Sequence, residues 1–243
     1  MKIALFGNGK MGQLVATQAR AAGYEIGAVI TSDSGATSHD DLAARLRGHD
    51  VAIDFTVAAA VERNIMACVH AKVPLVEGTT GWPEPGAIFR IVTDQGGALI
   101  HGANFSVGVN LFYQVVARAG ELFARSSDYA PFIEEAHHQQ KRDAPSGTAL
   151  RLHDLLKERI EREIPIASTR AGAIPGTHRV GFDSAADQIM LTHTARSRAG
   201  FASGALLAAN WIVGRTGVFA FSDLIDELIA DCQLPIANYP KGK

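Results

Sequence analysis

The densest set of reactive side chains in this chain lies in residues 134–150, which read E-E-A-H-H-Q-Q-K-R-D-A-P-S-G-T-A-L. His137, His138 and Lys141 offer proton donors and cationic contacts for an anionic substrate. The segment begins at the end of an expected strand and finishes at the start of an expected helix. Backbone N–H groups and two hydroxyls at that helix start suit a carboxylate, and they belong to Ser146, Gly147 and Thr148.

The same segment has two plainer interpretations. Adjacent histidines can be metal ligands, but neighbours on a strand point to opposite faces, and no third ligand is near in sequence. We therefore expect no metal. The segment can also be a solvated, charged loop. The carboxylate cradle beside two imidazoles and an ammonium favours a substrate site over both.

A second candidate site is the glycine loop, Gly7-Asn8-Gly9-Lys10-Met11-Gly12, which fits G-x-G-x-x-G between an apolar run and a helical pattern. In a dinucleotide-binding turn the first glycine permits the tight turn and the second lets the backbone approach a pyrophosphate. The third allows close contact between helix and strand. A tight turn without a ligand is the alternative.

The second expected strand is followed by Asp33, about 20 residues beyond the glycine loop, where a ribose-binding acid is expected. A plain turn residue in T-S-D-S-G is the alternative. Residues 31–44 contain no Arg or Lys that could clamp a 2′-phosphate. This favours NAD over NADP.

The elements that must position these motifs alternate in the first half of the chain. Apolar, strand-like runs lie at residues 3–6, 25–30, 51–55, 73–76 and 98–100. Helical patterns lie at 11–22, 40–47, 58–71 and from Pro83 or Pro85 toward 95. This alternation indicates a parallel sheet with helices on both faces.

The pattern changes after residue 104. Helices are expected at 107–124, 148–162, 201–213 and 218–230, and strands at 131–138, 177–182 and 188–195. Strands that follow strands indicate an α+β domain with a mixed or antiparallel sheet. We expect an α/β protein with a Rossmann-type parallel-sheet nucleotide-binding domain (1–105 with 217–243) and an α+β substrate-binding and oligomerisation domain with a mixed sheet (106–216).

Composition limits the class of protein. The chain has 243 residues, 47% of them hydrophobic, and a net charge of −2. This excludes collagen, coiled coil and wholesale disorder, and gives no electrostatic reason for a nucleic-acid or membrane partner. Cys68 and Cys232 are too few for a disulfide framework. With no visible targeting segment or membrane span, we expect a cytoplasmic protein.

Several motifs together resemble the dihydrodipicolinate reductase (4-hydroxy-tetrahydrodipicolinate reductase) family of lysine and diaminopimelate biosynthesis. The resemblance covers essentially the whole chain. Its motifs are E-A-H-H-x-x-K-x-D-A-P-S-G-T-A, the glycine loop, Gly78-Thr79-Thr80-Gly81, Ala103–Asn110, Arg170-Ala171-Gly172 with Gly176-Thr177-His178, and His193–Ala205. The glycine loop is shorter here than G-x-x-G-R-M-G of many members, and the acid and arginine after the second strand have no clear equivalent.

The resemblance implies reduction of 4-hydroxy-tetrahydrodipicolinate with NADH or NADPH, in a homotetramer assembled through the second-domain sheet. It implies that His137 is the acid/base residue and Lys141 a proton donor. The implied substrate contacts are His138, Lys141, Ser146, Gly147, Thr148 and Thr80. The implied cofactor contacts are Gly7, Asn8, Gly9, Lys10, Met11, Gly12, Gly78, Thr79, Thr80, Gly102, Ala103, Asn104 and Phe105.

Other interpretations stay open at this stage. The segment 78–81 can be a plain turn, and Asn104-Phe105 can be a helix cap at a hinge. Another two-domain amino-acid-type dehydrogenase is possible, although a semialdehyde dehydrogenase needs a thiol nucleophile. Cys68 falls in a helical run and Cys232 beyond the last helix, so neither is well placed. A non-enzymatic NAD(H)-sensing module leaves the residues from 137 to 148 unexplained.

Overall fold

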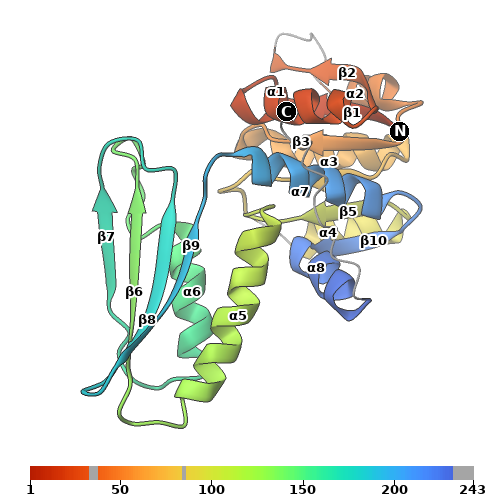
Figure 1. Cartoon of the computed structure of the whole chain (residues 1–243). Helices are drawn as coiled ribbons and strands as arrows, with labels where there is room; N and C mark the ends of the chain where they lie inside the picture. The colour runs from red at the N-terminus through yellow and green to blue at the C-terminus, as the bar shows by residue number, and fades with distance from the viewer. Residues whose placement is uncertain (33–37, 84–85, 232–243) are drawn as a thin grey trace. The chain divides into compact units, whose positions relative to one another are not determined.

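The computed structural model describes residues 1–32, 38–83 and 86–231. The chain forms two compact units (Figure 1). Unit 1 comprises Met1–Ser106 and Phe201–Lys243, and unit 2 comprises Val107–Gly200.

Unit 1 is built on a six-stranded sheet in which every pair of neighbours is parallel. The strand order is β10-β5-β4-β3-β1-β2. The strands are β1 (Lys2–Phe6), β2 (Glu25–Ile30), β3 (Val51–Asp54), β4 (Leu75–Glu77), β5 (Ala98–His101) and β10 (Gly217–Ala220). The central strands β3 and β4 are buried along their whole length, and each is apolar up to the acid that ends it, Asp54 in β3 and Glu77 in β4.

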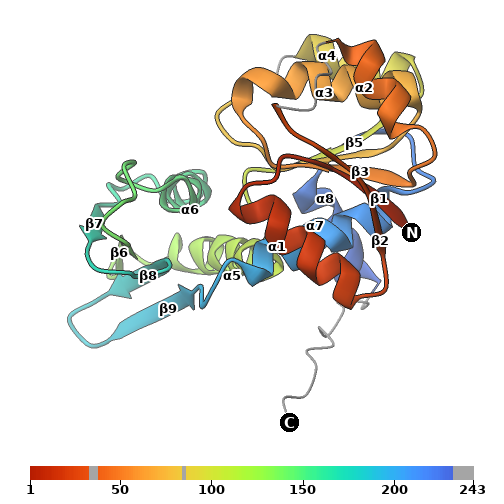
Figure 2. The same ribbon diagram turned by 90° about the horizontal axis from the view of Figure 1, so that it is seen from above.

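Helices cover both faces of this sheet (Figure 2). On one face lie α2 (His39–Leu46), α3 (Ala58–Ala71) and α4 (Gly86–Asp94). On the other lie α1 (Lys10–Ala21), α7 (Ala199–Ile212) and α8 (Phe221–Ala230). The Rossmann-type first domain expected from the alternation of strands and helices is confirmed.

The structure groups α7 with unit 1, whereas the expected second domain ran to residue 216. Hydrogen bonds join α7 to the α1 region: Ser203 donates to Gln18 at 3.1 Å, and the Asn210 amide and the Tyr24 hydroxyl bond each other at 2.9 and 3.1 Å. A Cβ on Gly204 would stand 1.7 Å from the Phe105 carbonyl oxygen. Helix α7 therefore packs closely on residues of unit 1, and residues 201–212 belong to that unit.

Unit 2 is a four-stranded mixed sheet with two helices on one face (Figure 1). The sheet order is β7-β6-β8-β9, with β7 parallel to β6 and the other pairs antiparallel. The strands are β6 (Ala130–His137), β7 (Ile166–Arg170), β8 (Thr177–Asp183) and β9 (Gln188–Thr194), and the helices are α5 (Val107–Phe123) and α6 (Gly147–Lys157). The mixed sheet expected for this domain is confirmed.

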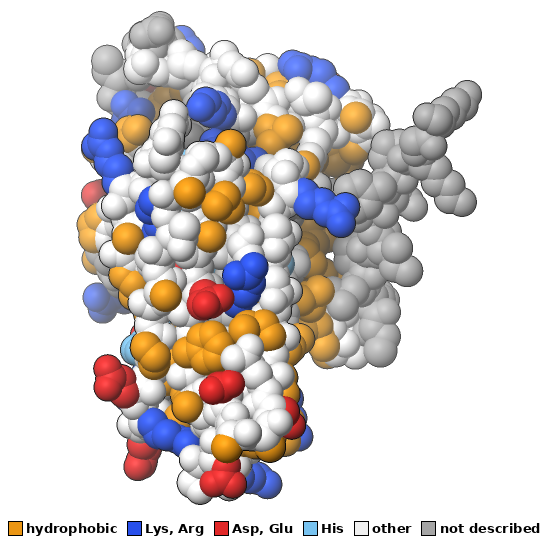
Figure 3. Space-filling model, turned by 60° about the vertical axis from the view of Figure 1, so that its left-hand side comes forward, with side chains coloured by type: hydrophobic (Ala, Val, Ile, Leu, Met, Phe, Trp, Pro, Cys, Tyr) orange, Lys and Arg blue, Asp and Glu red, His pale blue; other side chains and the backbone are white. Residues whose placement is uncertain are grey.

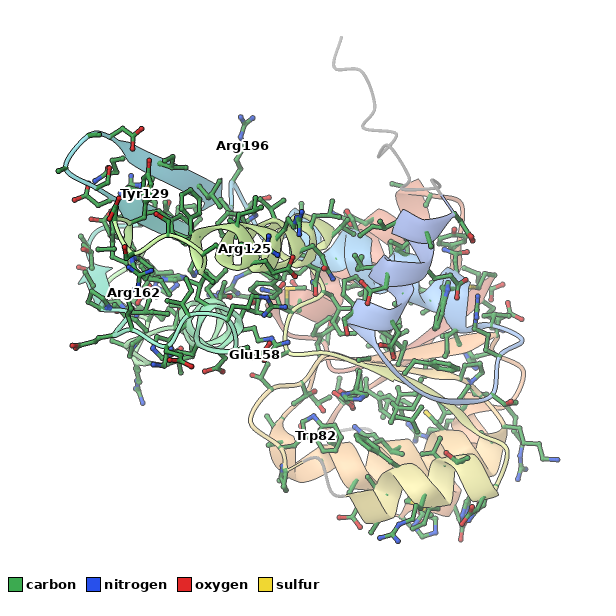
Figure 4. The ribbon with its side chains drawn as sticks, turned by 90° about the horizontal axis from the view of Figure 1, so that it is seen from below. Trp82, Arg125, Tyr129, Glu158, Arg162 and Arg196 are labelled. Carbon is green, nitrogen blue, oxygen red and sulfur yellow. The ribbon has the colours of Figure 1, made fainter. Side chains whose placement is uncertain are left out.

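Alternate residues of β6 face the helices, and Ile133 packs with Val180 and Leu156 in the core of unit 2. Arg162, which follows α6, and Tyr129, which precedes β6, lie in unit 2 (Figure 4). Arg162 donates to the carbonyl oxygens of Ser126 and Ser127 at 2.5 and 2.8 Å.

Two element predictions were wrong, and one strand was missed. Residues 218–220 belong to strand β10, because they pair with β5; the helix begins only at Phe221, where Asp223 accepts the Ala220 N–H at 2.8 Å. Strand β7 was missed, because this edge strand has an exposed polar centre. Helix α6 ends at Lys157 and not at Arg162.

Among the helices of the described residues, none has the length and hydrophobicity that a bilayer crossing needs.

Candidate functional site

The glycine loop joins β1 to α1, and within the protein itself Gly7 and Gly12, but not Gly9, have a steric reason to be glycine. Gly7 has φ +90°, a backbone conformation that residues other than glycine rarely adopt. A Cβ on Gly12 would stand 2.3 Å from the Gly7 carbonyl oxygen, so this position requires close backbone approach. A Cβ on Gly9 would meet nothing within 4 Å.

Gly9 also caps α1 without any side-chain hydrogen bond to the first turn. Asn8, Gly9 and Lys10 are exposed, and Met11 is half-buried. The first N–H groups of a helix attract anions, and the open space over Gly9 is where a Cβ would obstruct a ligand. These features fit the pyrophosphate of a dinucleotide. Asp33, the expected ribose contact, lies outside the described residues.

The turn from Gly78 to Gly81 follows β4 at the same edge of the sheet. Thr79 points inward: its N–H donates to Glu77 at 2.7 Å, and its hydroxyl lies 3.4 Å from Asp54. Thr80 is exposed. The side chain of Thr80 is therefore free to contact a cofactor, whereas Thr79 is occupied by its contacts with Glu77 and Asp54.

Beyond the turn, Trp82 packs on Phe89 of α4, with ring centroids 6.1 Å apart (Figure 4). This contact fixes the far end of the turn against the helix layer.

The loop after β5 holds the third expected cofactor segment, Gly102, Ala103, Asn104 and Phe105. The Asn104 side chain accepts the Ser106 N–H at 2.9 Å, which shapes the loop. Phe105 is 2% exposed and packs on Phe55 and Phe221. Since its ring belongs to the core of unit 1, only its backbone is available to a cofactor.

In unit 2, His137 is tied to a buried ion pair. Its Nδ1 forms a hydrogen bond with Glu135, two residues earlier on β6. Arg170 of β7 donates to the two oxygens of Glu135 at 2.6 and 3.0 Å and to the Asp143 carbonyl at 2.6 Å. Arg170 thus fixes both the carboxylate that orients His137 and the loop after β6.

A row of polar side chains crosses the sheet on its helix-facing side. Glu135 pairs in register with His178 of β8, and His178 pairs with His193 of β9. His178 Nε2 lies 3.1 Å from the Ser146 hydroxyl, which accepts the Ala149 N–H as the cap of α6. Ser146 is buried, and its hydroxyl both caps α6 and contacts His178. Its backbone N–H donates a hydrogen bond to Glu135 at 3.3 Å.

Burial and neighbouring charges set the protonation of this row. Burial alone would raise the pKa of Glu135, but hydrogen bonds from Arg170, Ser168 and His137 lower that pKa to about 2. Burial lowers the pKa of His137, although the Glu135 hydrogen bond opposes this. Burial also lowers the pKa of His178 to about 4. Near neutral pH the ion pair is charged and both imidazoles are neutral.

Lys141 and Thr148 lie near this row and have hydrogen-bond partners of their own. Lys141 Nζ is 2.8 Å from each oxygen of Asp143. The Thr148 hydroxyl forms a hydrogen bond with Tyr113 of α5. His138 is half-buried, and its Nδ1 has no hydrogen-bond partner among the described residues. Gly147 opens α6 and is exposed.

Sequence reasoning gave no role to Glu135, Asp143, Arg170, His178 or His193, although all five lie in the motifs it quoted. No third metal ligand was expected near His137 and His138 in sequence, but the fold brings other ligand-type side chains to His137. Glu135, His137 and His178 place ligand-type atoms within 4.8 Å of one another, because β8 pairs with β6. Arg170 already holds that carboxylate through both oxygens.

The model for the dihydrodipicolinate reductase N-terminus matches residues 1–100, and that for the dihydrodipicolinate reductase C-terminus matches residues 108–225. This chain belongs to the dihydrodipicolinate reductase family. Members reduce 4-hydroxy-tetrahydrodipicolinate with NADH or NADPH in lysine and diaminopimelate biosynthesis, and this is the reaction of the present chain.

Relatives support the assignment over most of the chain. The 4-hydroxy-tetrahydrodipicolinate reductase of Christiangramia forsetii is 39% identical over 241 residues, covering 94% of this chain and 99% of that protein. The enzyme of Neisseria gonorrhoeae is 31% identical over 264 residues, covering 93% and 97%. The resemblance stated from the motifs is confirmed.

Solved structures show the same fold. A dipicolinate-bound dihydrodipicolinate reductase from a Paenisporosarcina species aligns with a TM-score of 0.76 and 24% identity, covering 92% of this chain and 99% of that one. A probable dehydrogenase from Thermotoga maritima aligns with a TM-score of 0.58 and 10% identity, covering 94% of each chain.

Proposed function

We propose that the reductase reaction divides its tasks between the two units. Unit 1 holds the nicotinamide cofactor at the glycine loop, the turn after β4 and the loop after β5. Unit 2 holds the dicarboxylate substrate and supplies the proton through the segment from His137 to Thr148. The observation that carries this proposal is the buried Glu135, which joins Arg170 to His137.

The residues of the glycine loop suit the cofactor. The open position at Gly9 and the uncapped start of α1 would hold the pyrophosphate, with Asn8, Lys10 and Met11 beside it. When bound, the reduced nicotinamide supplies the hydride. Thr80 and the backbone of residues 102–105 would complete the contacts at the carboxyl ends of β4 and β5.

His137 handles the proton through Nε2, because Nδ1 is committed to Glu135. Its lowered pKa makes the free imidazole neutral near pH 7. A bound dicarboxylate adds negative charge nearby, which raises the pKa of His137 and favours protonation in the complex. Glu135 then stabilises the imidazolium, and Arg170 keeps Glu135 ionised.

Lys141 is the second proton donor in this proposal, and it also binds a substrate carboxylate. Asp143 holds its ammonium group in place. His138, Thr148 and the N–H groups at the start of α6 bind substrate carboxylates, since a helix N-terminus favours negative charge. Ser146 contributes as the cap that shapes this helix start.

A kinetic experiment tests the division of roles. His137→Gln should lower kcat with little change in the substrate KM, the pattern of an interaction made mainly in the transition state. Circular dichroism checks the fold of the variant. Full kcat in His137→Gln would contradict the role given to this residue.

We propose that the enzyme prefers NADH to NADPH and that Asp33 contacts the ribose of the cofactor. The support is the position of Asp33 after β2 and the absence of Arg or Lys from residues 31–44 of the sequence. Side-by-side kinetics with NADH and NADPH, for the parent and for Asp33→Ala, test this. An unchanged ratio of the two efficiencies would contradict it.

The homotetramer is proposed to form through the open face of the unit 2 sheet. The helices of unit 2 cover one face, and Phe132 and Met190 lie on the other, each opposite Gly181. Met190 is 37% exposed. Figure 3 views the molecule from this side and shows hydrophobic side chains gathered between charged ones.

A cytoplasmic location is proposed from the cysteines. The chain has two, and Cys68 is free and buried, as suits a reducing compartment.

A further inference from the structure

Two neighbouring strands of unit 1 each end on a buried acid. Asp54 ends β3 and Glu77 ends β4, and the two are paired in register. They are 0% and 1% exposed. Paired residues of adjacent strands point to the same face of a sheet, so the two carboxyl groups are neighbours beneath the turn Gly78–Gly81.

The hydrogen-bond donors are unequally divided between these carboxyl groups. Asp54 accepts from the Thr56 N–H at 2.8 Å and from Asn64 Nδ2 at 2.7 Å, and the Thr79 hydroxyl lies 3.4 Å away. Glu77 accepts the Thr79 N–H through Oε1 at 2.7 Å. Its other oxygen, Oε2, is buried without a conventional partner among the described residues. The donors favour Asp54 as the charged member.

Helix α3 packs over this pair and brings no counter-charge to it. Its Arg63 reaches only the amide oxygen of Asn64, at 3.4 Å. Its Cys68 stays a neutral thiol, because burial and the two nearby acids raise the pKa of that thiol.

The adjacent strands present no fixed cation either. His101 of β5 is the paired residue of Glu77, and its ring packs on Phe89 of α4 with centroids 4.9 Å apart. Phe6 of β1 is the paired residue of Asp54. Within the described residues, no Lys or Arg forms an ion pair with Asp54 or Glu77.

We propose that Asp54 and Glu77 share one proton, with Glu77 the neutral acid that donates from Oε2 to Asp54, and that this pair holds Thr79 and the cofactor turn above it. Two adjacent buried carboxylates without a cation repel each other and lack solvation, and a single shared proton removes both costs. Glu77 is then a positioning residue, since it acts on the cofactor through Thr79. This role rests on the proposed function of the turn Gly78–Gly81.

The pair makes the turn sensitive to pH. Burial and the charge of Asp54 raise the pKa of Glu77 from 4.5 to about 9. The folded-state pKa of Glu77 lies above its ordinary value of 4.5. The contribution of Glu77 to the stability of the fold is therefore complete below pH 4.5 and is lost as the pH rises toward about 9. Above about pH 9, Glu77 is ionised and repels Asp54, which weakens the contacts of the two carboxyl groups with Thr79.

The protonation is measured directly in the intact protein by ¹³C NMR of the side-chain carboxyl carbons, with Glu77 assigned by its loss in Glu77→Gln. A midpoint near 9 is expected. A midpoint near the ordinary 4.5 overturns the shared proton. This measurement needs neither cofactor nor turnover, so its result is independent of the proposed function.

The positioning role is measured by calorimetric titration with NADH from about pH 6 to about pH 10. The parent should lose affinity by about tenfold per pH unit above the midpoint. Glu77→Gln should keep its affinity across the range, because an amide donates to Asp54 without titrating. Glu62→Gln, an exposed change on α3, is the matched control and should follow the parent.

Three outcomes are distinguishable. Loss of affinity in the parent but not in Glu77→Gln supports the proposal. Affinity that does not change with pH in the parent overturns the positioning role. If Gly9→Val leaves NADH affinity unchanged, the proposed cofactor site fails, whatever the NMR titration of Glu77 shows.

Discussion

Arg170 donates one hydrogen bond to each carboxylate oxygen of Glu135, at 3.0 and 2.6 Å, from the parallel strand next to it. The carboxylate is fully buried, and its other partners include His137, Ser168 and the Ser146 N–H. Glu135 therefore connects the orientation of the imidazole to the start of α6. Removing either end of this ion pair leaves an uncompensated buried charge.

Arg170→Lys should lower kcat by roughly 10- to 100-fold, because an ammonium cannot span both oxygens and His137 loses its fixed orientation. Steady-state kinetics measure this. Arg179→Lys is the matched control, since Arg179 pairs with Glu134 on an exposed part of the sheet, and its activity should match the parent. Equal activity of the two variants would contradict the role of Arg170.

Stability in acid should depend on Glu135. Its folded-state pKa of about 2 lies below the ordinary 4.5, so its contribution is complete above pH 4.5 and is lost as the pH falls toward 2. The loss amounts to about 3 kcal/mol. Urea unfolding at several pH values should show the parent's advantage over Glu135→Gln shrinking across this range. The exposed Glu134→Gln should keep the parent's pH dependence.

The glycine loop separates binding from folding. Gly9→Val should leave the melting temperature unchanged and weaken NADH binding by at least about tenfold, because the new side chain occupies open space over the helix start. Gly12→Ala should instead cost about 1–3 kcal/mol of stability, since its Cβ meets the Gly7 carbonyl oxygen. Calorimetry and thermal melts measure the two effects. A stable Gly12→Ala would show that the loop can relax.

Thr148→Val should raise the substrate KM by about tenfold with a smaller effect on kcat, because it removes a ground-state hydrogen bond to a carboxylate. The Thr148 hydroxyl also contacts Tyr113. Tyr113→Phe tests whether the effect passes through that contact. If Tyr113→Phe raises KM as much as Thr148→Val does, the direct substrate contact is contradicted.

Met190→Lys should shift the protein to a smaller assembly, because a charge on the open sheet face opposes close packing of a second copy. Sedimentation equilibrium measures the mass. Arg151→Glu, an exposed change on α6, should not alter it. An unchanged mass in Met190→Lys would show that the copies do not meet through this face.

The sequence alone was enough for the features that depend on residues close together in the chain. Apolar runs such as those of β1 and β5, alternating with helical patterns, indicate a parallel sheet because such strands are buried on both faces. The glycine loop and the start of α6 were equally readable, since a turn and a helix N-terminus form from adjacent residues.

Only the tertiary structure decided which distant residues meet. The pairing of β6 with β7 and β8 brings Arg170 and His178 to Glu135, and the pairing of β3 with β4 brings Asp54 to Glu77. Strand order and register follow from packing of the whole unit, so no local pattern shows them. The charge of a buried group depends on these neighbours, and for that reason the protonation of Glu77 and of His137 could not be predicted from the sequence.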